Sequence, residues 1–178
     1  EFLDIARRTA DGIYDLFITQ GKPGYGGHAA LEMALVRLYR ETGDSRYLDL
    51  ASEWIERRGH PWPHEWSGDR TYFADDVPIR ECPDVVGHAV RTVMYLTGAA
   101  EVAIETGDES LKAAARRLWD IMVLKKLYVT GNVGSIYSDE AFGPAYELPN
   151  YSYSESCATC ALMFFSDAMF RMNGDSTY

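Results

Sequence analysis

The sequence predicts an all-α fold made of helical hairpins, and a repeated turn signal carries this prediction. The pair glycine-aspartate ends one helical segment and begins the next, because glycine closes a helix in the left-handed conformation and aspartate caps the following helix. The pair occurs three times, 64 and 67 residues apart, at Gly43-Asp44, Gly107-Asp108 and Gly174-Asp175. A period of this length is typical of two antiparallel helices repeated in a closed or stacked array. No stretch of the chain alternates as a strand does, so we expect about three consecutive hairpins with no central β-sheet.

Apolar residues that recur every three to four positions indicate six helices. We expect them at residues 1–19, 28–42, 46–58, 85–106, 109–124 and 154–172. Four prolines make residues 59–84 irregular, and we expect Trp62 and Trp66 to pack this loop, with stacking on a sugar as the alternative. The chain starts in helical rhythm without a cap, and its last four residues, 175–178, are where a further helix is expected to begin. We therefore expect residues 1–178 to be part of a longer domain, truncated at both ends.

Composition limits the classes of function. A chain of 178 residues with 47% hydrophobic and 13% aromatic residues can form one domain with a substantial core. The net charge of −10 argues against nucleic acid or an anionic membrane surface as a partner, and no apolar run of about 18 residues is present to span a membrane. The three cysteines fit a reducing compartment, with the cytoplasm slightly favoured, or a metal site better than a disulfide framework. Compartment and oligomeric state stay open, including a homodimer of the full-length protein.

The loop from Gly131 to Cys160 is far longer than the usual connection of about 4–6 residues, which is typical of functional loops. It carries the acids Glu140 and Glu155, and it ends on the thiols Cys157 and Cys160. A carboxylate beside a thiolate is a ligand pair that zinc uses. The alternative is a well-packed surface loop that leads into a helix with two buried cysteines.

The helical repeat is expected to place further polar side chains near this loop. The three helices that end in the repeated glycines run in the same direction if they line the inside of a helical barrel, so their first residues meet at one mouth. His28, His88 and the Glu155/Cys157 pair lie 15–19 residues before their glycines, which is roughly 22–28 Å along a helix. We therefore expect His28, His88, Glu140, Glu155 and Cys157 to line one cavity. The alternative for each histidine alone is an ordinary capping or buried residue.

Several motifs of the chain resemble one family of glycosidases. Residues 128–135 (YVTGNVGS), 139–142 (DEAF), 147–150 (ELPN) and 154–158 (SESCA) resemble the catalytic segment of the DUF1680 glycosidases, which are glycoside hydrolase family 127. The founding activity of this family is β-L-arabinofuranosidase. Residues 27–28, 32–39 and 87–91 also resemble the family, so the resemblance covers nearly the whole chain. It implies that residues 1–178 are part of the family's catalytic domain, an (α/α)6 barrel.

The resemblance also implies roles for individual residues. Glu140 falls on the family's general acid/base, and Glu155 and Cys157 fall on two zinc ligands. The two further zinc ligands are expected to be cysteines beyond Tyr178. One of those cysteines is the nucleophile that forms the glycosyl-enzyme intermediate in the family, so residues 1–178 alone are expected to be inactive and to bind zinc weakly.

The implied function is a retaining, zinc-dependent glycoside hydrolase that acts on β-L-arabinofuranosides or related plant-type sugars. His28 and His88 fall on histidines that hydrogen-bond the sugar. Two alternatives stay open: another α/α-toroid carbohydrate enzyme that needs no metal (an epimerase or an unsaturated-uronide hydrolase), or a non-catalytic helical carbohydrate-binding module. The chain departs from the family at Asp76 and Cys82, which puts the sugar specificity in doubt. Cys160 lies outside the family's zinc set and is either a spare ligand or part of the core.

Overall fold

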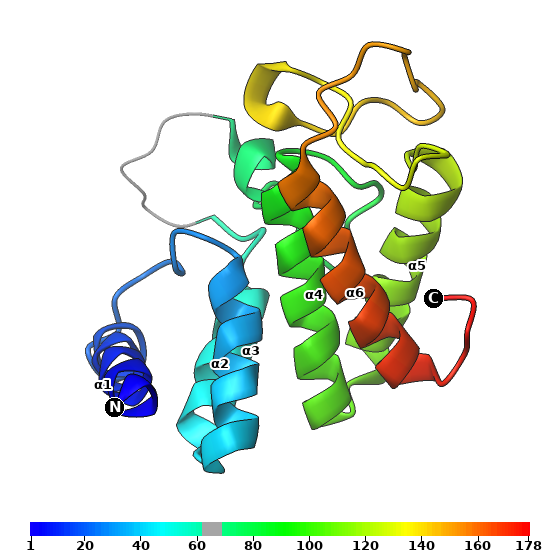
Figure 1. Cartoon of the computed structure of the whole chain (residues 1–178). Coiled ribbons are helices and arrows are strands. Elements are labelled where there is room, and N and C mark those ends of the chain that lie inside the picture. Colours follow the sequence, from blue (N-terminus) through cyan, green and yellow to red (C-terminus); the bar gives the residue numbers. More distant parts are fainter. Residues whose placement is uncertain (62–68) are drawn as a thin grey trace.

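The computed structural model describes residues 1–61 and 69–178, which pack as helices with no β-strand among them (Figure 1). The helices are α1 (Phe2–Tyr14), α2 (Ala30–Thr42), α3 (Ser45–Arg57), α4 (Ala89–Thr106), α5 (Glu109–Lys125) and α6 (Ser156–Asn173). Shorter turns are the π-helical η1 (Asp15–Thr19) and the 3₁₀ turns η2 (Arg70–Phe73) and η3 (Ser138–Glu140). The all-α prediction is confirmed, whereas Trp62 and Trp66 lie outside the described residues. None of the described helices combines the length and apolar character that a membrane span requires.

The repeated turn signal works as predicted. The glycines that follow α2, α4 and α6 have φ angles of 72°, 72° and 66°, in the left-handed region that glycine enters most easily: Gly43, Gly107 and Gly174. After the first two of these glycines, the aspartate side chain accepts backbone N–H groups at the start of the next helix. The first two signals therefore each end one helix and cap the next, which produces the hairpins α2–α3 and α4–α5.

Three helices begin two or more residues later than their apolar pattern predicts, and the second begins at Ala30 rather than at residue 28. The fourth expected helix begins four residues late, because Gly87 has a φ of 80° and interrupts the helical backbone. The sixth begins two residues late, because Ser154 has a φ of 44°. The apolar pattern runs through the break before α4 because the loop residues there are buried as well. As a result His88 and Glu155 are the N-cap residues of α4 and α6 rather than helical residues.

Helix α4 is the centre of the fold, with α2 and α6 packed on its two sides (Figure 1). Helix α3 contacts both α2 and α4, and α5 contacts α4. A small residue permits the closest approach, since a Cβ atom on Gly98 of α4 would lie only 2.8 Å from Cβ of Glu32 on α2. Helices α2, α4 and α6 run in the same direction in Figure 1, so their first residues lie at one end of the layer, as predicted.

A buried carboxylate ties these three helices together near their C-terminal ends. Glu101 of α4 is fully buried, and its Oε2 atom lies 2.7 Å from Nη2 of Arg40 on α2. Arg171 of α6 binds the same carboxylate with both of its terminal nitrogens. The end of the layer opposite the predicted site is therefore held by charge-assisted hydrogen bonds.

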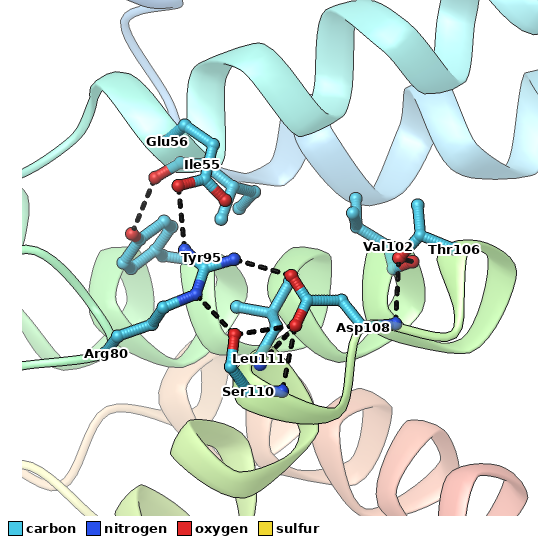
Figure 2. A network of polar contacts seen from close by, with 9 residues as sticks. All are labelled: Ile55, Glu56, Arg80, Tyr95, Val102, Thr106, Asp108, Ser110 and Leu111. Atoms are coloured by element: carbon cyan, nitrogen blue, oxygen red, sulfur yellow. Dashed lines mark hydrogen bonds and ion pairs between the residues drawn. The ribbon is translucent and has the colours of Figure 1, made fainter.

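A second polar network fixes the irregular segment that leads to α4 (Figure 2). Nη1 of Arg80 lies 2.7 Å from Oε2 of Glu56, near the end of α3. Its other two nitrogens donate to Asp108 Oδ2 at 2.7 Å and to Ser110 Oγ at 2.8 Å, at the start of α5. The same arginine thus holds the segment against both hairpins.

Replacing Glu101 tests the tie among the three helices. Glu101→Gln removes the charge that two partly buried arginines share, so we expect the free energy of unfolding to fall by about 2 kcal/mol. Glu109→Gln is the matched control, since Glu109 pairs with Lys112 on the exposed face of α5 and its loss should leave the free energy of unfolding nearly unchanged. Thermal unfolding of the purified protein measures both, and equal losses would contradict a special role for Glu101.

Candidate active site

Gly87 fixes the start of α4 against two loops. Its φ of 80° suits glycine, and a Cβ atom at this position would collide with the carbonyl oxygen of Thr71. The Gly87 carbonyl accepts the N–H of Phe142 at 2.9 Å, and an isolated antiparallel bridge pairs His88 with Ala141. The imidazole at the start of α4 is therefore positioned beside the loop that carries the predicted acid.

A polar side chain contacts each oxygen of the Glu140 carboxyl. His88 Nε2 lies 3.0 Å from Oε2, and the Tyr153 hydroxyl donates to Oε1 at 2.8 Å. Glu140 and Asp139 have φ angles of 52° and 57°, a left-handed pair that costs backbone energy in residues other than glycine. Strained backbone of this kind clusters at functional sites.

The bond to Glu140 also affects the tyrosine. That hydrogen bond is the first cause that raises the pKa of Tyr153 to about 12, followed by burial and by nearby negative charges that include Glu155 and Cys157. The hydroxyl therefore stays protonated, and remains a donor, across the neutral range. The electrostatic influence of both acids on one hydroxyl also indicates that they belong to one polar centre.

His28 lies at the start of α2, close to the same centre. Its Nδ1 atom accepts the backbone N–H of Ala30 at 3.2 Å, so the imidazole caps the first turn. Partial burial of the ring lowers the pKa of His28, although the residue keeps much of its surface exposed, and the neighbouring charges of Arg91 and His88 lower it further. The ring is therefore neutral near pH 7 and can exchange hydrogen bonds with an uncharged ligand. Arg91 donates to the carbonyl of Gly27 at 2.7 Å and fixes the approach to this cap.

Glu155 and Cys157 form a second pair at the start of α6. A hydrogen bond to Glu155, and then the negative charge of that carboxylate, raise the pKa of the Cys157 thiol. The Oε2 atom of Glu155 is buried without a partner among the described residues. Both Cys157 and Cys160 are exposed, so the alternative interpretation, a helix with two buried cysteines, is wrong. The reason is that the first turn of α6 turns this face away from the core.

A metal ion would find only part of a ligand set in this pair. Zinc is usually bound by four side chains in tetrahedral geometry, and a carboxylate beside a thiol supplies two of the right kind. The unpartnered buried oxygen of Glu155 also fits a group that awaits a cation. No group of three or more histidine, cysteine, aspartate or glutamate residues within the described ranges is arranged to hold a metal. The residues present therefore fit half of a zinc site.

The structure brings the predicted residues together as two contacting pairs with His28 nearby. Tyr153 links the pairs, since its hydroxyl binds Glu140 and its backbone lies two residues before Glu155. Sequence reasoning missed Tyr153, because a tyrosine in an aromatic loop gives no signal of the atom that it will face. It also missed Tyr72, whose ring stands edge-on to the His88 ring with 5.2 Å between centroids. That the five predicted residues line one cavity stays a prediction.

The loop in which the chain departs from the family makes contacts of its own. Cys82 is half-buried, and its Sγ atom donates to the carbonyl oxygen of Asp84 at 3.0 Å. Burial raises the pKa of this thiol, which therefore stays neutral near pH 7. Cys82 and Asp76 line a small cavity whose wall also includes residues of α4.

Comparison with known proteins assigns the family. The model of a family described as "Beta-L-arabinofuranosidase, GH127 catalytic domain" matches residues 1–178. This chain belongs to the GH127 family. It is 35% identical, over 99% of its length, to a segment that makes up 30% of a curated "Non-reducing end beta-L-arabinofuranosidase" from Bifidobacterium longum subsp. longum.

Solved GH127 structures share the fold. A GH127 β-L-arabinofuranosidase from Geobacillus stearothermophilus T6 has a TM-score of 0.91 and 36% identity over 99% of this chain and 31% of that one. The GH127 β-arabinofuranosidase BT3674 has a TM-score of 0.88 and 41% identity over 98% of this chain and 27% of that one. These likenesses confirm the expected fold class, part of an (α/α)6 barrel. The chain spans less than a third of the length of these relatives.

Two glycines allow a matched test of how this GH127 chain positions His88. Gly87 and Gly107 share the left-handed conformation, but a Cβ atom on Gly107 would meet nothing within 4 Å. Gly107→Ala should cost about 1 kcal/mol of unfolding free energy, from backbone strain alone. Gly87→Ala should cost about 3 kcal/mol or more, because the backbone of residues 71–72 must also move. Chemical denaturation measures both, and equal costs would mean that the contact with Thr71 imposes no constraint.

Proposed function

We propose that the full-length protein that contains these residues is a retaining, zinc-dependent glycoside hydrolase that acts on β-L-arabinofuranosides. The observation that carries the proposal is the Glu140 carboxyl, held between His88 and Tyr153 in the loop that also supplies the Glu155/Cys157 pair. The names of the GH127 relatives support the choice of substrate. Related plant-type sugars are the nearest alternatives.

Glu140 is suited to move a proton. In the first step its carboxylic acid protonates the glycosidic oxygen as the C–O bond breaks, and the bonding electron pair leaves with that oxygen. In the second step the resulting carboxylate accepts a proton from the water that releases the sugar. The same carboxyl therefore needs to be close to the substrate in both states, which a group fixed at each oxygen can satisfy.

The histidines are suited to hold an uncharged sugar. His28 is exposed at the start of α2, and its lowered pKa keeps the ring neutral, able to donate or accept a hydrogen bond. His88 is buried beside the acid, with its Nδ1 atom unpartnered among the described residues. Both rings lie at the beginnings of neighbouring parallel helices, where a small sugar can reach them together.

Glu155 and Cys157 are the residues that would hold zinc. When bound, zinc would lower the pKa of a coordinated thiol and keep it as the nucleophilic thiolate. Two further cysteine ligands, one of them the nucleophile, are proposed to come from outside residues 1–178. Because this chain supplies two ligands of four, these residues alone are proposed to bind zinc weakly and to lack activity.

Hydrolysis by the full-length protein tests the proposal. We expect release of L-arabinose from a β-L-arabinofuranosyl disaccharide, with little release from the α-linked isomer, and about one zinc ion per catalytic domain by elemental analysis. Binding of the disaccharide without turnover would favour a carbohydrate-binding module. Turnover by a metal-free protein would favour another α/α-toroid enzyme.

The two glutamates should separate in a paired substitution experiment. Glu140→Gln cannot deliver a proton, so we expect kcat/KM on a disaccharide to fall by about 10²–10⁴-fold with zinc content unchanged. An aryl leaving group that needs little protonation should lose less in the glycosylation step. Glu155→Gln should instead lower zinc content, since it removes a carboxylate ligand. Metal loss in Glu140→Gln together with zinc retention in Glu155→Gln would reverse the two assignments.

A further inference from the structure

The side chain of Glu140 lies on the surface, yet its carboxyl is fixed at two points. About 41% of the side chain is exposed, and an exposed glutamate ordinarily samples several rotamers. Here the Tyr153 hydroxyl donates to Oε1 at 2.8 Å and His88 Nε2 lies 3.0 Å from Oε2. Two contacts on the two oxygens of one carboxyl define the plane of the group as well as its position.

Tyr153 is itself anchored through its backbone and its ring. Its N–H donates to the carbonyl of Ser135 at 3.2 Å, and the N–H of Ser154 donates to the carbonyl of Gly134 at 2.8 Å. Its ring stands edge-on to that of Tyr137, with 5.7 Å between centroids. The hydroxyl therefore approaches Glu140 from a segment that is held by backbone hydrogen bonds of its own.

That backbone segment is joined to the start of α4. Gly134 has a φ of 82°, and a Cβ atom there would lie 2.7 Å from Cβ of Ala89, the first residue of α4. Gly134 therefore packs against Ala89, the residue after His88, while residues 134–135 accept the backbone N–H groups of residues 153–154. The two groups that hold Glu140 share one support, so their separation is fixed by the fold.

From this geometry we infer that Tyr153 is a positioning residue, which orients the Glu140 carboxyl for proton transfer in the glycosidase reaction proposed above. The Tyr153 hydroxyl at Oε1 and His88 Nε2 beside Oε2 together fix the plane of the carboxyl. The carboxylic acid gives its proton to the glycosidic oxygen as the C–O bond breaks, and the electron pair departs with the leaving group. Tyr153 keeps the same bond to Oε1 before and after this transfer, so the acid and the base state share one orientation.

Two Tyr→Phe variants of the full-length protein test this role. Tyr153→Phe removes only the hydroxyl and leaves the ring against Tyr137. Tyr137→Phe is the matched control, because it removes a hydroxyl that donates to the carbonyl of Ser152 at 3.2 Å and does not contact Glu140. Each variant is assayed on a β-L-arabinofuranosyl disaccharide and on a 4-nitrophenyl β-L-arabinofuranoside, with zinc content and melting temperature measured alongside.

For Tyr153→Phe we expect kcat on the disaccharide to fall by about 10–100-fold and on the nitrophenyl substrate by less than about 3-fold, since an activated leaving group needs little protonation. KM, zinc content and melting temperature should stay close to those of the wild type. Tyr137→Phe should remain within about 2-fold of the wild type on both substrates. Unchanged rates in Tyr153→Phe would overturn the inference, as would equal losses on both substrates accompanied by lower stability.

A structural measurement keeps the inference separate from the proposed function. If the wild type hydrolyses neither substrate, the proposed function fails, but the orientation of Glu140 can still be compared in crystals of the full-length wild type and of Tyr153→Phe. We expect one carboxyl orientation in the wild type and several in the variant. A single, unchanged orientation in Tyr153→Phe would overturn the positioning role whatever the activity.

Discussion

The polar centre depends on one close backbone contact, between the carbonyl of Thr71 and Gly87. Only a residue without a side chain permits this approach. The left-handed φ of 80° at Gly87 ends the preceding loop, so that His88 is the N-cap and α4 begins at Ala89. The Gly87 carbonyl then receives the N–H of Phe142, which aligns the acid-bearing loop with the helix start. The His88 imidazole and the Glu140 carboxyl are therefore close together because the loops that carry Thr71 and Phe142 both contact Gly87.

The ion pairs that hold the central helices together and the polar groups of the candidate site lie at opposite ends of these helices. Near the C-terminal ends of α2, α4 and α6, Glu101 binds two arginines and holds the helices side by side. At their beginnings the polar groups are less completely paired: His88 Nδ1 and Glu155 Oε2 are buried without partners among residues 1–61 and 69–178. Buried polar atoms are normally hydrogen-bonded, so unpaired ones concentrated at one end indicate groups arranged for a ligand.

Much of the fold could be predicted from the sequence because its signals are local. Glycine at positive φ and aspartate at the N-cap act within one turn, so the pairs at Gly43 and Gly107 mark helix ends correctly without knowledge of the fold. The late start of α4 could not be predicted in the same way. It results from the contact of Gly87 with Thr71, a residue in a different segment, while the apolar pattern of a buried loop resembles that of a helix.

The candidate site could likewise be predicted only in part from the sequence. The shared direction of three helices was enough to predict that His88 and the Glu155/Cys157 segment lie at one end. The role of Tyr153 was not predictable, because it depends on residues 134–135 pairing with residues 153–154 across a long loop. Likewise, the exposure of Cys157 and Cys160 depends on how the first turn of α6 leaves the core, which the apolar pattern of α6 alone does not fix.

The central claim is that one loop divides its two glutamates between proton transfer and metal binding within a single centre. Anomalous scattering at the zinc edge from crystals of the full-length protein tests this division most directly. The account predicts one strong peak within about 2.0–2.4 Å of both a Glu155 carboxylate oxygen and Cys157 Sγ, with Glu140 left uncoordinated and still bound to Tyr153. A peak coordinated by Glu140, or zinc bound away from Glu155 and Cys157, would contradict it.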